Sequence, residues 1–116
     1  MADRFYIVDL RREWNWRPCI SFWRPKNAGY AYPLAWSGQY EPSDLIPGYH
    51  EKAEGRSIIR FPVLCQTVEA LSSSPPSGLL DDDTQPVVMN TAENRSALRS
   101  ARYRFTSRRA ALAEER

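Results

Sequence analysis

The chain has 116 residues, 42% of them hydrophobic and 12% aromatic, which suffices for the core of one small domain. No run of apolar residues approaches the roughly 18 needed to cross a bilayer, so we expect no transmembrane helix and no membrane partner. The N-terminus lacks a signal-peptide pattern, and Cys19 and Cys65 have no CxxC partner, so we expect a cytoplasmic protein and do not favour a disulfide.

The net charge of +2 hides an uneven distribution. Residues 1–40 carry six Lys or Arg against three acids, residues 41–91 carry three against eight, and residues 92–116 carry seven against three. The ends are therefore basic and the middle is acidic. This pattern argues against a uniformly nucleic-acid-coated protein and leaves room for a local basic patch.

Two segments near the N-terminus predict an antiparallel hairpin. Residues 5–10 and 19–23 are rich in aromatic and β-branched side chains, which favour strands, and the polar residues 11–18 connect them. Because Asp9 should stay in contact with water, we expect the opposite side of the first strand to face the core. That side carries Tyr6, Val8 and Leu10.

Residues 22–40 hold six aromatic side chains, two prolines and two glycines. Pro25 ends the preceding strand, and residues 27–29 tolerate the positive φ of a tight turn. Residues 30–33 predict a short edge strand, and residues 33–38 predict one helical turn closed by glycine. We interpret the whole stretch as a rigid aromatic platform.

The middle of the chain predicts a further strand at residues 57–61, by its β-branched content, and a short helix at residues 63–71. Residues 72–86 are rich in Ser, Pro and Asp, which is typical of a linker.

The C-terminal segment predicts a longer helix. Asn90 is a suitable N-cap with Glu93 three residues later, and residues 92–113 contain neither glycine nor proline. At helical spacing its hydrophobic stripe consists of Leu98, Ala101, Phe105 and Leu112. The stripe docks on the sheet or, alternatively, crosses to a second copy or a foreign partner.

The expected fold is α+β, a small antiparallel sheet with one short helix and a longer C-terminal helix packed on it. The expected organisation is a β-rich domain at 1–71, a linker at 72–86 and the docked helix within 87–116.

Catalytic and metal-binding patterns are weak. The one histidine, His50, lies in a polar loop where we expect a surface residue, and no second histidine completes a metal set. Cys19 follows Pro18 in a predicted strand, so we expect it to be buried and inert. We therefore expect no enzyme, no cofactor and no metal.

Cations and planar rings alternate along residues 11–36. Such a set can stack unpaired bases and contact phosphates, it has the composition of protein–protein hot spots, and it can also form the core of a small domain. The acidic residues of the middle segment could instead compete for the basic groove of nucleic-acid-handling machinery. They are Asp81, Asp82 and Asp83, together with Glu41, Asp44, Glu51 and Glu54. The candidate partner-binding residues are Trp14, Trp16, Arg17, Trp23, Arg24, Lys26, Tyr30 and Trp36, with Asp81, Asp82 and Asp83.

The stretch Trp23-Arg-Pro-Lys-Asn-Ala-Gly-Tyr30, with Ser37-Gly-Gln-Tyr40 after it, resembles a pattern of small uncharacterised phage and prophage proteins. In those proteins a Trp-x-Pro-Asn-x-x-Gly-Tyr turn is followed by Ala-Gly-x-Tyr, and Ser37 stands here where alanine is frequent. The tail from Pro86 to Leu98 also resembles their closing segment, and this chain continues beyond it.

The resemblance implies a phage accessory protein that inhibits a host defence system by stoichiometric surface binding in the host cytoplasm. The leading expectation is an anti-CRISPR protein that blocks a Cas protein or effector complex. The alternative, from the residues themselves, is a small single-stranded nucleic-acid-binding protein that uses the aromatic and basic patch. A dimer through the C-terminal helix stays open.

Overall fold

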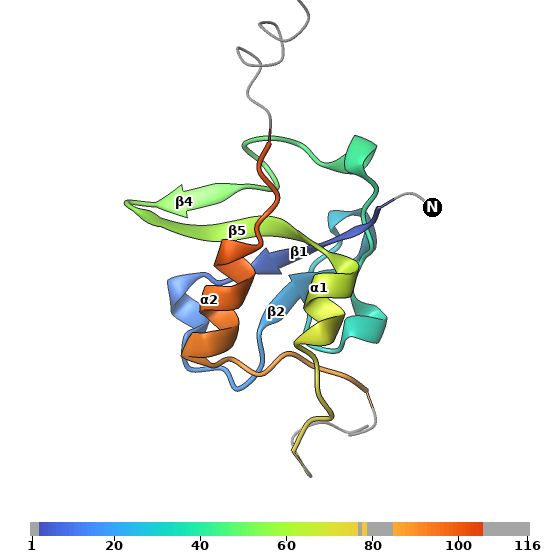
Figure 1. Cartoon of the computed structure of the whole chain (residues 1–116), viewed down its shortest axis with the longest axis vertical. Helices are drawn as coiled ribbons and strands as arrows, with labels where there is room; N and C mark the ends of the chain where they lie inside the picture. Colours follow the sequence, from blue (N-terminus) through green and yellow to red (C-terminus); the bar gives the residue numbers. More distant parts are fainter. Residues whose placement is uncertain (1–2, 77, 79–84, 106–116) are drawn as a thin grey trace, which may run out of the picture.

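The structure, a computed structural model, describes residues 3–76, 78 and 85–105. Among these residues the chain forms a five-stranded antiparallel sheet, in the order β3-β2-β1-β5-β4, with two helices (Figure 1). The fold is α+β, as predicted. The strands are β1 (Phe5–Asp9), β2 (Ser21–Trp23), β3 (Tyr30–Ala31), β4 (Lys52–Glu54) and β5 (Ser57–Leu64), and the helices are α1 (Cys65–Ala70) and α2 (Ala92–Ser100).

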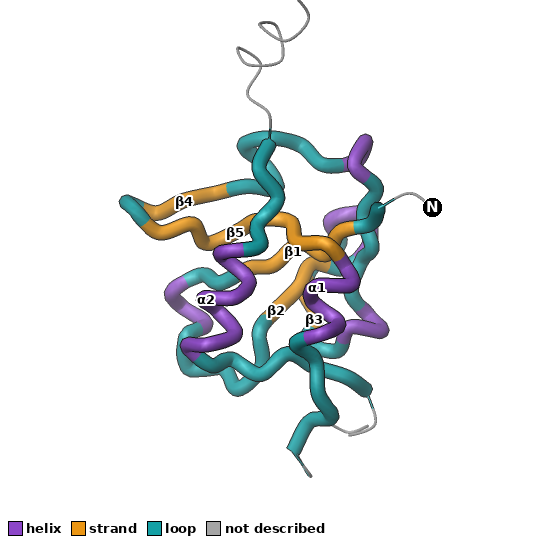
Figure 2. The backbone as a smooth tube through the Cα atoms, viewed as in Figure 1, coloured by secondary structure: helices purple, strands orange, loops and turns teal. Residues whose placement is uncertain are grey.

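Short 3-10 helices lie in the loops between the strands (Figure 2). They are η1 (Arg12–Trp14), η2 (Pro25–Asn27), η3 (Leu34–Trp36) and η4 (Pro42–Asp44). None of the described helices is both long and apolar enough to cross a membrane.

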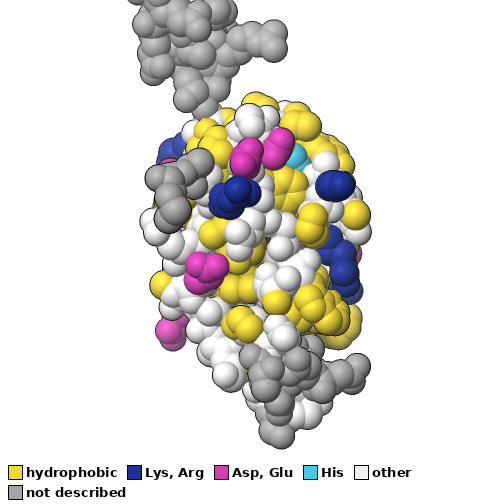
Figure 3. Space-filling model, turned by 90° about the vertical axis from the view of Figure 1, so that its right-hand side faces the viewer, with side chains coloured by type: hydrophobic (Ala, Val, Ile, Leu, Met, Phe, Trp, Pro, Cys, Tyr) yellow, Lys and Arg dark blue, Asp and Glu magenta, His cyan; other side chains and the backbone are white. Residues whose placement is uncertain are grey.

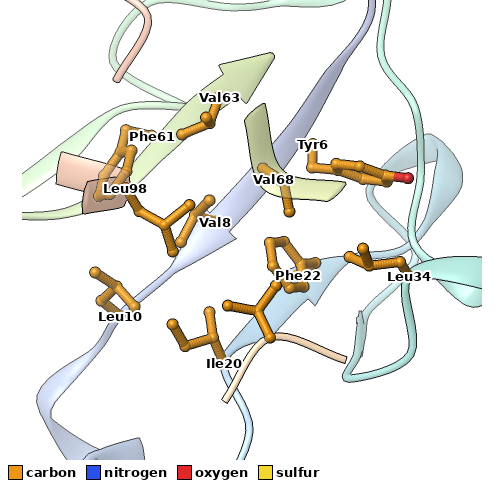
Figure 4. Close-up of a cluster of buried hydrophobic side chains, with 11 residues drawn as sticks. Tyr6, Val8, Leu10, Ile20, Phe22, Leu34, Phe61, Val63, Val68 and Leu98 are labelled. Carbon is orange, nitrogen blue, oxygen red and sulfur yellow. The ribbon is translucent and has the colours of Figure 1, made fainter. Parts of the chain in front are cut away.

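Both helices pack on the same face of the sheet, where the main hydrophobic core lies (Figures 1 and 4). Val68 of α1 and Leu98 of α2 are fully buried against Val8 and Phe22 and the other side chains of this cluster. The prediction that Tyr6, Val8 and Leu10 face the core is confirmed.

The opposite face of the sheet is also buried, which the sequence did not predict. Phe5, Ile7 and Trp23 pack there with Tyr40 and Leu45. The expectation that Asp9 stays in contact with water is therefore wrong, because Asp9 is only 2% exposed. Tyr40 and Leu45 cover this face, and no local pattern in β1 predicts that they do.

The sequence pattern does not predict the fourth strand, β4. All three of its residues are exposed, so it lacks the apolar alternation that marks a half-buried strand. Pairing with β5 across the turn at Gly55, whose φ is 59°, makes it a strand. β5 is longer than predicted and continues through Pro62 to Leu64.

Helix α2 is shorter than the predicted helix. Its N-cap is Thr91 rather than Asn90, and the Thr91 hydroxyl accepts a hydrogen bond from the Asn94 backbone N–H. The helix ends at Ser100, and residues 101–105 are not helical. The remainder of the predicted helix, including Leu112, lies outside the described residues.

The two ends of the predicted linker lie side by side. Ser73 and Val87 exchange two backbone hydrogen bonds of 2.8 and 2.9 Å. The division into a domain at 1–71, a linker and a helical segment stays a prediction.

Candidate binding face

Aromatic rings and guanidinium groups from three separate segments meet at the β3 edge of the sheet. We call this set the aromatic–basic face. It comprises Trp14, Trp16, Arg17, Arg24, Tyr30, Tyr32 and Trp36. Six of these residues, with Ala31 and Pro33, line a hollow of about 350 Å³; Trp16 lies outside it. Figure 3 shows a view in which basic side chains adjoin hydrophobic ones along one edge of the molecule.

The turn between β2 and β3 fixes one side of this face. Lys26, Asn27 and Gly29 all have positive φ values, of 58°, 59° and 105°. The Tyr40 hydroxyl holds the turn, because it accepts a hydrogen bond from the Asn27 backbone N–H at 3.0 Å and donates one to the Arg24 carbonyl. The predicted left-handed turn at 27–29 is therefore confirmed for Asn27 and Gly29, and Lys26 adds a third such residue.

Gly38 has a different role from the predicted turn closure. A Cβ atom there would lie 2.8 Å from the Cα of Pro25 and 2.7 Å from the Tyr40 ring. Gly38 is required because the segment after η3 passes directly over Pro25, and its φ is not positive.

Arg17 lies among three rings of the face. Its guanidinium carbon is 4.2 Å from the ring centroid of Trp14, 5.6 Å from that of Tyr32 and 5.7 Å from that of Trp16. Such cation–π contacts are worth about 0.5–2 kcal/mol each. Its Nε atom is buried and has no hydrogen-bond partner among the described residues.

Arg24 is held at the other end of the hollow. Its Nε donates to the Tyr30 carbonyl at 2.9 Å, and its guanidinium lies 5.5 Å from the centroid of the Trp36 ring. Among the described residues, neither Arg17 nor Arg24 has a carboxylate within 4.0 Å. Both positive charges thus lack an ion-pair partner in the part of the chain that the structure describes.

Arg11 behaves differently, because its charge is neutralised. Its Nη2 lies 2.9 Å from Oδ2 of Asp9 and also donates to the Tyr30 hydroxyl at 2.6 Å. The hydrogen bonds and charge of Asp9 raise the pKa of Arg11. This residue supports the ring of Trp14, 3.9 Å away, and contributes little free charge to the face.

The C-terminal segment also supports the face. The Asn90 side-chain amide donates to the Arg17 carbonyl at 2.8 Å and to the Asn15 carbonyl at 3.3 Å, and Arg95 in turn donates to Asn90 Oδ1 at 2.7 Å. These bonds hold the loop that carries Trp14, Trp16 and Arg17. No spacing in the sequence points to the two bonds between Asn90 and this loop, because the partners lie more than 70 positions apart.

The predicted candidate residues divide into three groups. Trp16, Tyr30 and Trp36 are exposed, by 77%, 38% and 55%, and Trp14, Arg17 and Arg24 are half-buried beside them. Trp23, whose ring centroid lies 6.0 Å from that of Tyr30, and Lys26 do not line the hollow of this face. Asp81, Asp82 and Asp83 lie outside the described residues.

Trp23 belongs to the second core and not to the binding face. It is 5% exposed, its indole N–H donates to Asp9 at 3.1 Å, and the Arg60 guanidinium lies 4.9 Å from its ring centroid. Lys26 is exposed but lines a separate hollow of about 600 Å³, together with Asn27, Asp44 and others. Burial of Trp23 is contrary to the predicted grouping with Trp16 and Trp36, and the predicted role of Lys26 in partner binding stays a prediction.

His50 is buried, contrary to the surface position that we expected. The Ile46 backbone N–H donates to its Nδ1 at 2.8 Å, so the ring proton is on Nε2, 2.8 Å from Asn27 Oδ1. Burial and the nearby Arg60 charge lower the pKa of His50, outweighing the opposite effect of Asp44. This neutral imidazole links the η4 loop to the turn that carries Arg24.

The pH dependence of stability follows from this arrangement. Since the folded-state pKa of His50 lies below its unfolded value of 6.5, its contribution is fully present above that value and is lost as the pH falls below it. We expect the free energy of unfolding to fall between pH 7 and pH 5 by at most about 1.4 kcal/mol per unit. Urea titrations of the wild type and of His50→Gln measure this slope, and an equal slope in both would contradict the assignment, since His50 is the one histidine.

The thiol pKa values of both cysteines are raised. Burial raises the pKa of Cys19, and burial together with Glu69 raises the pKa of Cys65 to about 12. Cys19 is buried, as predicted. The described residues also contain no group of three or more potential metal ligands. The side chains of the aromatic–basic face can stack on planar groups, make cation–π contacts and donate hydrogen bonds to anions.

Searches against protein-family models, curated proteins and solved structures returned no match for the chain.

Proposed function

We propose that this chain is a small, non-catalytic binding protein that takes single-stranded nucleic acid on its aromatic–basic face. The observation that carries the proposal is the pair Arg17 and Arg24, whose charges have no carboxylate partner among the described residues and lie beside exposed rings. Proteins that bind single strands without strong sequence preference combine these two features, cations for phosphates and rings for bases.

The direct test is a fluorescence titration of the full chain with single-stranded oligodeoxythymidine and oligouridine. We expect quenching of tryptophan emission at low salt and an affinity that falls steeply as salt rises, because phosphate contacts release counterions. Absence of quenching at low salt would exclude this function.

Removal of one exposed ring tests the face itself. Trp36→Ala should weaken binding by about 1–3 kcal/mol, which is the usual contribution of stacking one base on an aromatic ring. Ile46→Ala is the matched control, because Ile46 is also exposed, by 50%, but lines the separate hollow beside Lys26. Equal loss of affinity in both variants would argue against binding at the face.

The second candidate is the phage accessory inhibitor, with an anti-CRISPR action on a Cas protein or effector complex in the host cytoplasm. The sequence resemblance supports it, and so does the composition of the face, since Trp, Tyr and Arg dominate protein–protein hot spots. Its test is co-migration of the chain with purified effector complexes after nuclease treatment, together with loss of target cleavage. Inhibition that is unchanged by Trp16→Ala and Trp36→Ala would remove the face from this function.

A further inference from the structure

The hollow in the aromatic–basic face has the size of a small ligand site. Its volume of about 350 Å³ lies at the lower end of the roughly 300–1,000 Å³ usual for such sites. Trp14, Tyr30, Tyr32 and Trp36 supply the rings of its lining, and Arg17 and Arg24 supply the charges. Among the described residues, no carboxylate lines it.

The charges decide which kind of ligand fits. Several rings around a hollow can hold a quaternary or methylated ammonium group by cation–π attraction. Here the guanidinium of Arg17 already lies over the Trp14 ring and that of Arg24 lies near the Trp36 ring, so a cationic ligand would meet like charge. The lining instead complements a planar group that carries negative charge.

Both guanidinium groups are held in place before any ligand arrives. The Nε of Arg24 bonds the Tyr30 carbonyl, and the Nη1 of Arg17 makes one long contact of 3.4 Å to the Ser21 hydroxyl. The other terminal nitrogens of these two residues have no partner among the described residues. Fixed donors bind an anion with less loss of side-chain entropy than mobile ones.

The buried Nε of Arg17 is a second, independent observation. A buried polar atom without a partner costs about 1–3 kcal/mol, so native proteins retain few of them, and each one calls for an explanation. An anion beside this guanidinium would offset that cost by attraction to its charge. Two of the three rings around this guanidinium, those of Trp14 and Tyr32, also line the hollow.

From these observations we infer that the hollow is a subsite for one unpaired nucleotide, with the base against its rings and the phosphate between Arg17 and Arg24. This inference rests on the proposed function, and it names the unit of the strand that the face recognises. It also implies that base and phosphate are both required at the subsite.

Two ligands of equal charge separate base recognition from charge. A short oligodeoxythymidine and its fully abasic counterpart carry the same number of phosphates. We expect the abasic strand to bind roughly 5- to 150-fold more weakly, the loss that corresponds to unstacking one base. Equal affinity for the two strands would overturn the subsite.

Three variants place the subsite on the face. Arg17→Gln and Arg24→Gln should each lower the affinity for oligodeoxythymidine about tenfold and reduce the slope of its salt dependence, because each removes one phosphate contact. Arg12→Gln is the matched control, since Arg12 is exposed two residues before Trp14 in the chain but does not line this hollow. In ¹H–¹⁵N spectra the indole signal of the buried Trp23 reports on folding of each variant.

The outcomes distinguish the two proposals. If the oligonucleotide binds and all three arginine variants bind alike, the subsite is wrong while the nucleic-acid-binding function stands. If the wild-type chain binds neither oligonucleotide nor a 5′-mononucleotide at low salt, both are wrong. If a mononucleotide alone shifts the indole signals of Trp14 and Trp36, the subsite stands and strand binding does not.

Discussion

Replacement of Asp9 by alanine should lower the free energy of unfolding by about 3 kcal/mol, the lower part of the range for breaking a buried ion pair. The Asp9 side chain is 1% exposed and lies within 2.9 Å of Arg11 and 3.4 Å of Arg60, and it also accepts the Trp23 indole N–H. Removing the carboxylate leaves two guanidinium groups without their ion-pair partner and one indole N–H without its acceptor. The arginines, whose side chains are partly exposed, recover some hydration, which keeps the loss below the upper end of that range.

A surface ion pair supplies the matched control. Glu41→Ala breaks the contact between Arg4 and Glu41, whose side chains are each 48% exposed, at a similar distance of 3.3 Å. Exposed pairs contribute roughly 0–1 kcal/mol. Urea denaturation should therefore separate the two variants by about 2 kcal/mol, and equal losses would show that burial of Asp9 carries no special weight.

The acid limb of stability tests the same carboxylate. Burial by itself would raise the pKa of Asp9, but the hydrogen bonds from Arg11 and Trp23 and the charges of both arginines bring it below the ordinary 3.8. Its contribution is therefore present above the unfolded-state pKa and is lost as the pH falls through the folded-state value. The wild type should lose more stability than Asp9→Asn on acidification below pH 4.

Asp9 also shows where prediction from the sequence ends. The alternation in β1 correctly placed Tyr6 and Val8 in the core, because a period of two is a property of the strand itself. The burial of the opposite face of β1 depends on Tyr40 and Leu45, which lie more than 30 positions further along the chain. No local pattern contains that information. His50 was misplaced for the same reason, since its partners are Ile46 and Asn27 and the rings around them.

The candidate site, too, was only partly predictable from the sequence. The residue types of the face were evident from the sequence, because Trp, Tyr and Arg are dense between residues 14 and 36. Which rings are exposed was not evident. Trp23 pairs with Tyr30 across β2 and β3. Its indole N–H nevertheless donates to Asp9, and its ring packs in the second core. Only the three-dimensional structure separates this ring from Trp16 and Trp36.

Leu98→Ala should destabilise the protein by about 3 kcal/mol, within the 2–5 kcal/mol usual for buried leucines. Leu98 is fully buried and joins α2 to the main core (Figure 4). Since alanine is at least as good a helix former as leucine, the loss reports on packing and not on helix propensity. Ser96→Ala on the same helix is the control, because Ser96 is exposed, and it should change stability by less than about 0.5 kcal/mol.

The same pair of variants links stability to the binding face. Helix α2 follows directly after Asn90, which holds the backbone of the loop carrying Trp16 and Arg17. If α2 is an integral part of the domain, Leu98→Ala weakens ligand binding only at urea concentrations or temperatures where the whole domain begins to unfold. If α2 detaches by itself, oligonucleotide affinity falls before the β-sheet melts, as followed by far-UV circular dichroism. We expect the first result, because Leu98 shares one buried cluster with Val8, Phe22 and Phe61 of the central strands.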